Sequence, residues 1–155
     1  MSVDLENGHA GIDLSDFRRI MVIGAGKATA PMARAVEEIL GNRIDRGLIV
    51  VKYGHIVPLD IIETMESDHP MPDANGVAGA RRIVELADDA DERTLVLGLV
   101  SGGGSALLPL PLEGTADGAP VRLTLEDKRQ TTQALLACGA AIEEINCIRK
   151  HLSGV

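Results

Sequence analysis

Three short apolar runs constrain the fold more than any other feature of this sequence. They are rich in β-branched residues, end at or near a glycine, and occupy residues 18–24, 47–52 and 94–100. Apolar runs of this length, almost uninterrupted by polar residues, are typical of strands buried on both faces of a sheet. We therefore expect these segments to form a mostly parallel sheet, with the most apolar run, 94–100, at its centre.

Segments with helical periodicity alternate with these runs. Apolar residues recur at steps of three and four residues, or a helix-start signal precedes the segment, at 27–40, 73–87, 124–138 and 141–150. A weaker strand is expected at 61–66. The resulting order, strand-helix-strand-strand-helix-strand-helix-helix, predicts a Rossmann-like α/β fold with helices on both faces of the sheet. Ligands of such sheets bind at the carboxyl ends of the strands.

Two segments carry no clear periodicity. Residues 1–17 are polar and acidic at the start of the chain, and we expect them to form a lead-in to the first strand. Residues 109–121 contain Pro, Gly and Ala without a repeating apolar pattern, which predicts a long surface loop.

Composition argues against several classes of protein. The net charge is −8, and the chain has one Phe, one Tyr and no Trp, which disfavours nucleic-acid binding by a basic or aromatic surface. Cys138 and Cys147 fit neither a metal-binding spacing nor a disulfide framework. From its polar, acidic start we expect no signal peptide, and no apolar stretch approaches the roughly 18 residues of a membrane span. We expect a cytoplasmic protein with no membrane or nucleic-acid partner, and we assign no metal ligand from the sequence.

The first glycine-rich motif, Gly24-Ala25-Gly26-Lys27-Ala28, joins the first predicted strand to its helix. Its small residues allow a ligand to approach the backbone, and the helix N-terminus is expected to offer unpaired N–H donors to a phosphate or carboxylate. Lys27 adds a full positive charge. Neither the complete dinucleotide-binding fingerprint nor the Walker pattern is present. A tight turn that binds no ligand stays an alternative.

The second glycine-rich motif directly follows the most apolar run and reads Ser101-Gly102-Gly103-Gly104-Ser105. Three consecutive glycines are entropically costly to order in a purely structural turn. We therefore expect an anion-binding nest of backbone N–H groups, with both serine hydroxyls as further donors. A nucleophilic serine is disfavoured because the sequence lacks Gly-x-Ser-x-Gly.

Two further motifs carry polar side chains suited to ligand binding. His69 and Asp73 flank a stiff, proline-containing segment, where they can bind a substrate, a metal or a water molecule. The alternative is that Asp73 caps the following helix and His69 is a surface or half-buried residue. Asn146 precedes Arg149 and Lys150 by three and four residues, so the three share one helix face. Such cations suit carboxylate or phosphate groups, although they also stabilise a helix C-terminus without any ligand.

The four motifs, in this order, resemble the N-terminal domain of bacterial-type glycerate 2-kinases, some of which carry the label hydroxypyruvate reductase. The matching motifs are Gly-Ala-Gly-Lys-Ala, His-Pro-x-Pro-Asp, Ser-Gly-Gly-Gly-Ser-Ala-Leu and Glu-x-Asn-x-x-Arg-Lys-His-Leu-Ser. On this resemblance, residues 18–155 form a Rossmann-like N-terminal domain of a glycerate kinase.

The resemblance implies transfer of a phosphoryl group from ATP, with Mg²⁺, to the 2-hydroxyl of D-glycerate. It places the family's catalytic lysine at Lys27 and its basic helix at 146–151. The loop 101–105 would hold either the glycerate carboxylate or a phosphate of ATP. The residue types agree with this chemistry, because phosphoryl transfer depends on positioning and charge stabilisation rather than on a covalent nucleophile.

The resemblance also implies an active site between this domain and a second one. We therefore expect the chain to be a fragment that supplies one wall of the site, has the missing C-terminal domain as its partner, and is inactive alone. A homodimer stays open.

Two other functions stay open from the residues. An NAD(P)H-dependent hydroxypyruvate reductase would use the first glycine-rich turn, but Thr29 and Lys52 stand where a third glycine and a ribose-binding carboxylate are expected. A non-catalytic sugar-phosphate-binding module would account for both glycine-rich motifs but not for the other two.

Overall fold

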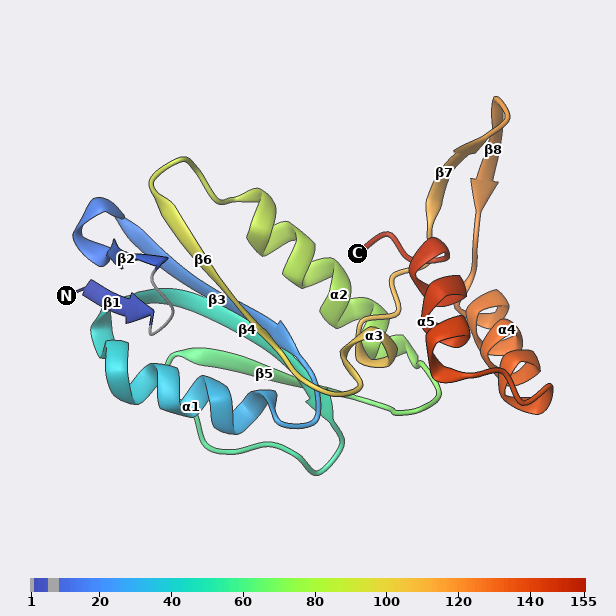
Figure 1. Ribbon diagram of the computed structural model, residues 1–155, viewed down its shortest axis with the longest axis horizontal. Coiled ribbons are helices and arrows are strands. Elements are labelled where there is room, and N and C mark those ends of the chain that lie inside the picture. Colours follow the sequence, from blue (N-terminus) through green and yellow to red (C-terminus); the bar gives the residue numbers. More distant parts are fainter. Residues whose placement is uncertain (1, 6–8) are drawn as a thin grey trace.

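The computed structural model describes residues 2–5 and 9–155 and is organised around one parallel sheet (Figure 1). The strands of this sheet are β3 (Arg19–Ala25), β4 (Ile44–Lys52), β5 (Ile62–Ser67) and β6 (Thr94–Val100). Their order is β5-β4-β3-β6, and all three neighbouring pairs are parallel. The predicted α/β fold with a parallel sheet is confirmed.

Helices cover both faces of the sheet. On one face, α1 (Thr29–Leu40) contributes the buried side chains Ala30 and Ala33 to one apolar cluster. On the other face, α2 (Ala74–Asp88) and the short α3 (Gly104–Leu107) contribute Ile83 and Leu107 to a second cluster. Small residues on α1 allow it to lie close to the aliphatic side chains of the sheet, so this core contains no aromatic residue.

Strand β6 lies at an edge of the sheet, so the prediction that 94–100 forms the centre is wrong. The central strands are β3 and β4, where Ile49 is fully buried, whereas Val100 on β6 is 74% exposed. Within residues 2–5 and 9–155, no strand pairs with the outer edge of β6. An apolar run indicates burial between layers but carries no information about lateral position in the sheet.

Both segments predicted to lack regular structure contain antiparallel strands. In the lead-in, β1 (Ser2–Leu5) pairs with β2 (His9–Asp13), and a 3-10 turn, η1 (Leu14–Asp16), follows. In the expected surface loop, β7 (Glu113–Ala116) pairs with β8 (Ala119–Arg122). Asp117 and Gly118 join these two strands with φ angles of 50° and 79°. Asp-Gly is a strong two-residue hairpin signal, which predicts this turn despite the weak strand pattern around it.

The last two helices, α4 (Leu125–Ala137) and α5 (Ile142–His151), lie beside the carboxyl end of the sheet, where α5 contacts α3 (Figure 1). A reciprocal capping box between Thr124 and Asp127 starts α4, as the sequence predicts. A short 3-10 turn, η2 (Gly41–Arg43), follows α1. Among the residues that the structure describes, no helix is both long and apolar enough to cross a membrane.

Candidate functional site

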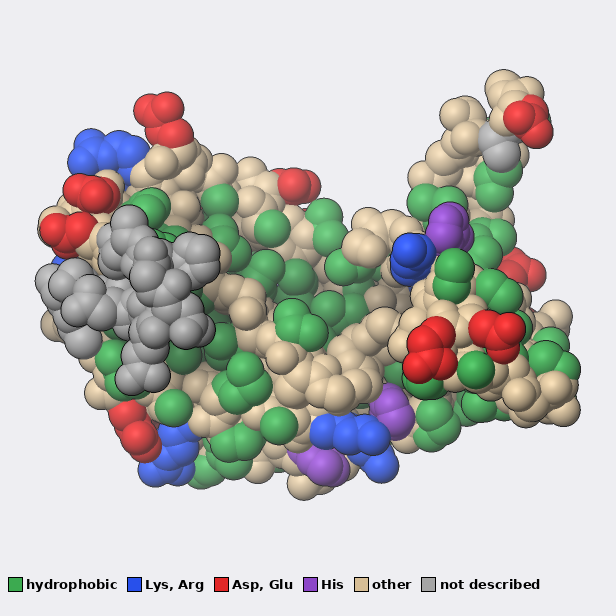
Figure 2. Space-filling view, in the orientation of Figure 1, with side chains coloured by type: hydrophobic (Ala, Val, Ile, Leu, Met, Phe, Trp, Pro, Cys, Tyr) green, Lys and Arg blue, Asp and Glu red, His purple; other side chains and the backbone are tan. Residues whose placement is uncertain are grey.

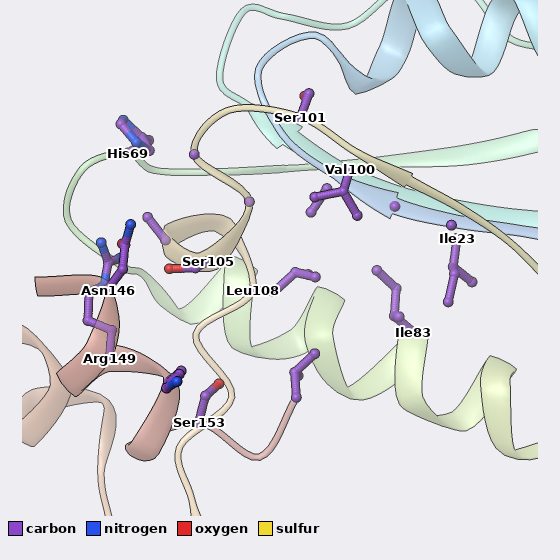
Figure 3. Close-up of a pocket in the computed structure, with 18 of the residues that line it drawn as sticks. Ile23, His69, Ile83, Val100, Ser101, Ser105, Leu108, Asn146, Arg149 and Ser153 are labelled. Carbon is purple, nitrogen blue, oxygen red and sulfur yellow. The ribbon is translucent and has the colours of Figure 1, made fainter. Parts of the chain in front are cut away.

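A cavity of about 790 Å³ lies at the carboxyl end of the sheet, between α2, α3 and α5. Its two ends differ in chemistry (Figure 3). His69, Ser105, Asn146 and Arg149 lie together at the polar end, and Ile23, Ile83, Val100 and Leu108 form the apolar end. Basic and histidine side chains gather in two groups where the sheet meets the α4–α5 pair (Figure 2).

The cavity brings together most of the predicted site residues. Its lining includes Gly24, His69, Ser101, Gly103, Gly104, Ser105, Asn146, Arg149 and Lys150. Gly26, Lys27, Gly102 and Asp73 are not part of the lining. Lys27 nevertheless meets it at Gly103, because a Cβ atom built on Gly103 would lie 3.5 Å from Lys27 Cε and 2.8 Å from His69 Cδ2.

The first glycine-rich turn is tied to the second glycine-rich loop rather than open to a ligand. Its N–H groups donate to protein acceptors: Gly26 to the Val50 carbonyl at 3.1 Å, Lys27 to the Gly102 carbonyl at 3.0 Å, and Ala28 to Ser101 Oγ at 3.0 Å. Ser101 Oγ also lies 3.0 Å from Thr29 Oγ1. The expectation of unpaired donors at this turn is therefore wrong for these three groups. Ligand contact by Gly24 or Gly26 stays a prediction.

The second glycine-rich loop does leave donors unpaired. The backbone N–H groups of Gly102, Gly103 and Ser105 donate to no acceptor in the described part of the chain. Gly103 has a φ angle of 88° and lies against the His69 ring, so a side chain there would be strained and would clash. Three free N–H groups and the Ser105 side chain are suited to an oxyanion.

His69 is surrounded by positive charge. Partial burial, followed by the charges of Lys27, Lys52 and Arg149, lowers the pKa of His69 below its usual value. The imidazole is therefore mainly neutral at pH 7. Its ring nitrogens make no hydrogen bond to any described residue, so they are free to contact a ligand.

The cations at this site lack acidic partners. Lys27, Arg149 and Lys150 form no ion pair with any residue that the structure describes. Burial lowers the pKa of Arg149, although its guanidinium stays charged at neutral pH. The cavity lining contains no Asp or Glu. The protein therefore leaves excess positive charge beside free N–H donors, which favours an anionic ligand.

Lys128 is absent from the set of residues predicted from the sequence. It lines the cavity and is only 6% exposed, with Nζ donating to the carbonyls of Leu110 and Leu152 at 3.1 Å each. Burial and, to a lesser extent, Arg149 lower its pKa from 10.5 to about 8. A lysine in the first turns of a capped helix is usually solvent-exposed, so the sequence offers no signal for this burial.

The Asp73 carboxylate is fully used within the protein. Its Oδ1 accepts hydrogen bonds from Ser67 Oγ and the Gly76 N–H, which caps α2, and its Oδ2 accepts from Tyr53 Oη and the Asp68 N–H. The alternative that Asp73 caps its helix is confirmed. Asp73 anchors the segment that carries His69, and substrate contact by Asp73 itself stays a prediction.

Asp73→Ala is expected to lower the free energy of unfolding by about 3 kcal/mol. About 1 kcal/mol comes from the lost helix cap and the rest from the fully buried Ser67 hydroxyl, which loses its acceptor. Urea denaturation of both proteins measures the difference. Thr124→Ala, which removes only the cap of α4, is the matched control, with an expected loss of about 1 kcal/mol. Equal losses for the two variants would contradict the anchoring role of Asp73.

The contribution of Asp73 is also expected to depend on pH. Burial alone would raise its pKa, but the hydrogen bonds from Gly76, Tyr53 and Ser67 outweigh this and lower the pKa below 3.8. Its stabilising effect is therefore fully present above pH 3.8 and is lost as the pH falls below that value. The stability difference between the wild type and Asp73→Ala should shrink on acidification. A difference that stays constant down to pH 2.5 would contradict this assignment.

A family model agrees with the whole described chain. The model for DUF4147, a domain of unknown function, matches residues 2–155.

Relatives with curated names and solved structures show the same likeness. A D-glycerate 2-kinase from Thermotoga maritima is 47% identical over 138 residues, which make up 88% of this chain and 31% of that protein. An Agrobacterium vitis protein named "Putative hydroxypyruvate reductase" is 44% identical over 88% of this chain and 34% of its own length. The crystal structure of a Thermotoga maritima glycerate kinase matches with a TM-score of 0.76 and 47% identity, over 88% of this chain and 31% of that one. This chain spans about one third of the length of these relatives.

Proposed function

The chain belongs to the DUF4147 family, and from its likeness to a D-glycerate 2-kinase we propose that it forms part of a kinase that transfers a phosphoryl group from ATP to the 2-hydroxyl of D-glycerate. The product of this reaction is 2-phosphoglycerate. The proposal rests mainly on one observation. Free N–H groups and unpaired cations converge on a cavity whose lining contains no carboxylate, which suits a substrate and a nucleotide that are both anionic.

Lys27 is the proposed catalytic residue. Its side chain reaches Gly103 at the rim of the cavity, and its ammonium group forms no ion pair with any described residue. A free ammonium at this point can stabilise the negative charge that develops on the transferred phosphoryl group. Because the N–H groups of the first turn are already paired, we assign the charge of Lys27, rather than the turn's backbone, to the phosphoryl group.

The remaining site residues are proposed to bind and orient the two substrates. The free N–H groups of loop 101–105 would hold a phosphate or carboxylate oxygen. Asn146, Arg149 and Lys150 would contact the second anionic group from α5, where Arg149 can bind a carboxylate through two parallel hydrogen bonds. Neutral His69 would contact the glycerate hydroxyl, because it can accept a hydrogen bond where the surrounding cations cannot.

Mg²⁺, which accompanies ATP in such a reaction, is not matched by the residues of this cavity. Mg²⁺ prefers carboxylate and phosphate oxygens, but the lining has no Asp or Glu, and the Asp73 carboxylate is already saturated. The described residues contain no group of three or more His, Cys, Asp or Glu that could hold a metal ion. We therefore assign no protein ligand and no step to Mg²⁺ in this chain.

The geometry does not favour hydride transfer from a dinucleotide. A pyrophosphate at the first turn would need the N–H groups that donate to Ser101 and Gly102, and the space beside Gly26 is filled by Ser101. Strand β4 ends in Lys52 rather than in a carboxylate for the ribose. We accordingly give the kinase precedence over a reductase.

A chimera provides the sharpest test of the proposed function. The 138 matched residues of this chain would replace their counterparts in the Thermotoga maritima D-glycerate 2-kinase. With Mg-ATP, NADH, D-glycerate and hydroxypyruvate present together, we expect 2-phosphoglycerate to form and NADH to persist, as read by mass spectrometry. Consumption of NADH without phosphoglycerate would overturn the proposal.

The 155-residue chain alone is expected to give no turnover in the same mixture. The proposed active site needs a second wall, which we propose to be the region that corresponds to the remaining two thirds of the relatives. Robust turnover by the chain alone would contradict this division of the site.

A further inference from the structure

One buried and one half-buried cation share the cavity without any acidic partner. Lys128, on α4, is 6% exposed, and Arg149, on α5, is half-buried. Both line the cavity, and neither forms an ion pair with a residue in the described ranges. Burying like charges together is unfavourable unless an anion accompanies them. This arrangement therefore needs an explanation beyond packing.

The ammonium group of Lys128 is only partly satisfied. It has three N–H donors, of which two point to the Leu110 and Leu152 carbonyls, both 3.1 Å away. These bonds hold Nζ between Leu110, in the segment after α3, and Leu152, which directly follows α5 and the helical turn that contains Arg149. One donor remains, on a group that lines the cavity.

A structural tie alone does not account for a lysine here. The segments that Lys128 joins are also held by the Leu112 N–H donating to the Leu152 carbonyl at 3.2 Å and by the Gly154 N–H donating to the Leu110 carbonyl at 3.0 Å. A neutral donor would complete this set without the desolvation of a full charge. The charge itself therefore points to a ligand.

We propose that Lys128 and Arg149 form an oxyanion-binding pair, in which Lys128 donates its third N–H to a carboxylate or phosphate oxygen held between them. Lys128 thus joins the site as a ligand-contacting residue that lies outside the four sequence motifs, on the predicted helix α4. Only the assignment of this oxyanion to glycerate or to a nucleotide phosphate rests on the proposed function.

The proposal predicts how Lys128 titrates. In the free chain, burial and Arg149 hold its pKa near 8. An anion bound between the two cations stabilises the charged ammonium, so binding should raise this pKa. A lysine that merely ties two carbonyls together, at a distance from the ligand, should titrate almost unchanged.

Lysine-selective ¹³Cε NMR on the 155-residue chain tests this directly. The sequence contains four lysines, so single Lys→Arg variants suffice to assign the signals. Titrations from pH 6 to 11 would be recorded without ligand, with inorganic phosphate and with D-glycerate. We expect the Lys128 signal to titrate near pH 8 without ligand and at least one pH unit higher at saturation with one of the two probes. The effective probe identifies phosphate or carboxylate as the preferred group.

Variants separate the anion pair from a structural role. Arg149→Gln should raise the pKa of Lys128 in the free chain and weaken binding of the effective probe about tenfold, the effect of losing one charge-assisted contact. Lys128→Met should weaken binding by a similar factor. Arg122→Gln, which removes an exposed cation paired with Glu113 on the distant hairpin, should leave binding unchanged.

Three results would overturn the proposal: neither probe binds, a probe binds without moving the Lys128 titration, or Arg149→Gln leaves that titration unchanged. Because the wild-type titration needs no substitution, unfolding of a Lys128 variant does not prevent the test. The readout also requires no turnover. A chimera that consumes NADH and makes no 2-phosphoglycerate would therefore refute the kinase without affecting the anion pair.

Discussion

Lys27→Ala in the chimera is expected to lower kcat about 10²- to 10³-fold, the usual effect of removing one group that stabilises transition-state charge. Its side chain lies beside Gly103, and its ammonium group pairs with no described acidic residue. The charge on the phosphoryl oxygens grows during transfer, so kcat should fall by a larger factor than KM rises. Steady-state kinetics with varied D-glycerate and ATP measure both constants.

The control for this substitution is Arg34→Ala on α1, the helix that follows the turn containing Lys27. Arg34 is an exposed cation that pairs with Glu38 at 3.1 Å, a contact that contributes little to stability or catalysis. The Arg34→Ala chimera should keep its kcat within about twofold of the kcat of the unmodified chimera. If Lys27→Ala raises KM and preserves kcat, Lys27 binds a ground-state anion and is not the catalytic residue.

Gly26→Ala is expected to destabilise the fold by about 4 kcal/mol or more, enough to leave much of the chain unfolded. The φ angle at Gly26 is 145°, where a side chain is strained, and the new Cβ would overlap Ser101 Oγ and lie 2.8 Å from the Ser101 backbone carbon and oxygen. Removing the hydroxyl with Ser101→Ala should not rescue the variant, because the backbone overlap remains. Urea denaturation and far-UV circular dichroism measure the loss.

Gly102→Ala is the matched control for Gly26→Ala. It lies in the facing loop, has no positive φ angle, and a Cβ atom there meets nothing within 4 Å. Its free energy of unfolding should change by less than about 1 kcal/mol. Similar losses for the two alanine variants would contradict the close apposition of the first turn and loop 101–105.

The regular elements were largely predictable from local patterns. The strands β3, β4 and β6 follow from their apolar runs, and α1 and α2 follow from apolar residues at helical spacing together with Gly41 and Asp73 at their ends. These signals are local, because side-chain alternation, chain breakers and caps act within a few residues. The hairpin β7–β8 was not predicted because its strands are short and weakly apolar, although the Asp-Gly pair is typical of a hairpin turn.

The sequence motifs also identified most residues of the candidate site. They did not show which backbone and side-chain groups of these residues are free to bind a ligand. In both glycine-rich motifs the sequence offers backbone donors beside small residues. The structure shows that Ser101 and Gly102 occupy the donors of the first turn, whereas Gly103 and Ser105 keep theirs free. Asp73 likewise carries a group that suits a ligand, but both oxygens of its carboxylate already accept hydrogen bonds from residues before and after it in the chain.

The sequence by itself therefore determined the layered α/β fold, the order of its main elements and the four motifs that meet at the carboxyl end of the sheet. Only the tertiary structure decided that β6 lies at an edge of the sheet and that the N–H groups of the first glycine-rich turn are paired within the protein. It alone also decided that Lys128 is buried near Arg149. The reason is physical. Strand and helix formation depend on nearby residues, whereas the pairing of a donor or the desolvation of a charge depends on groups brought from distant parts of the chain.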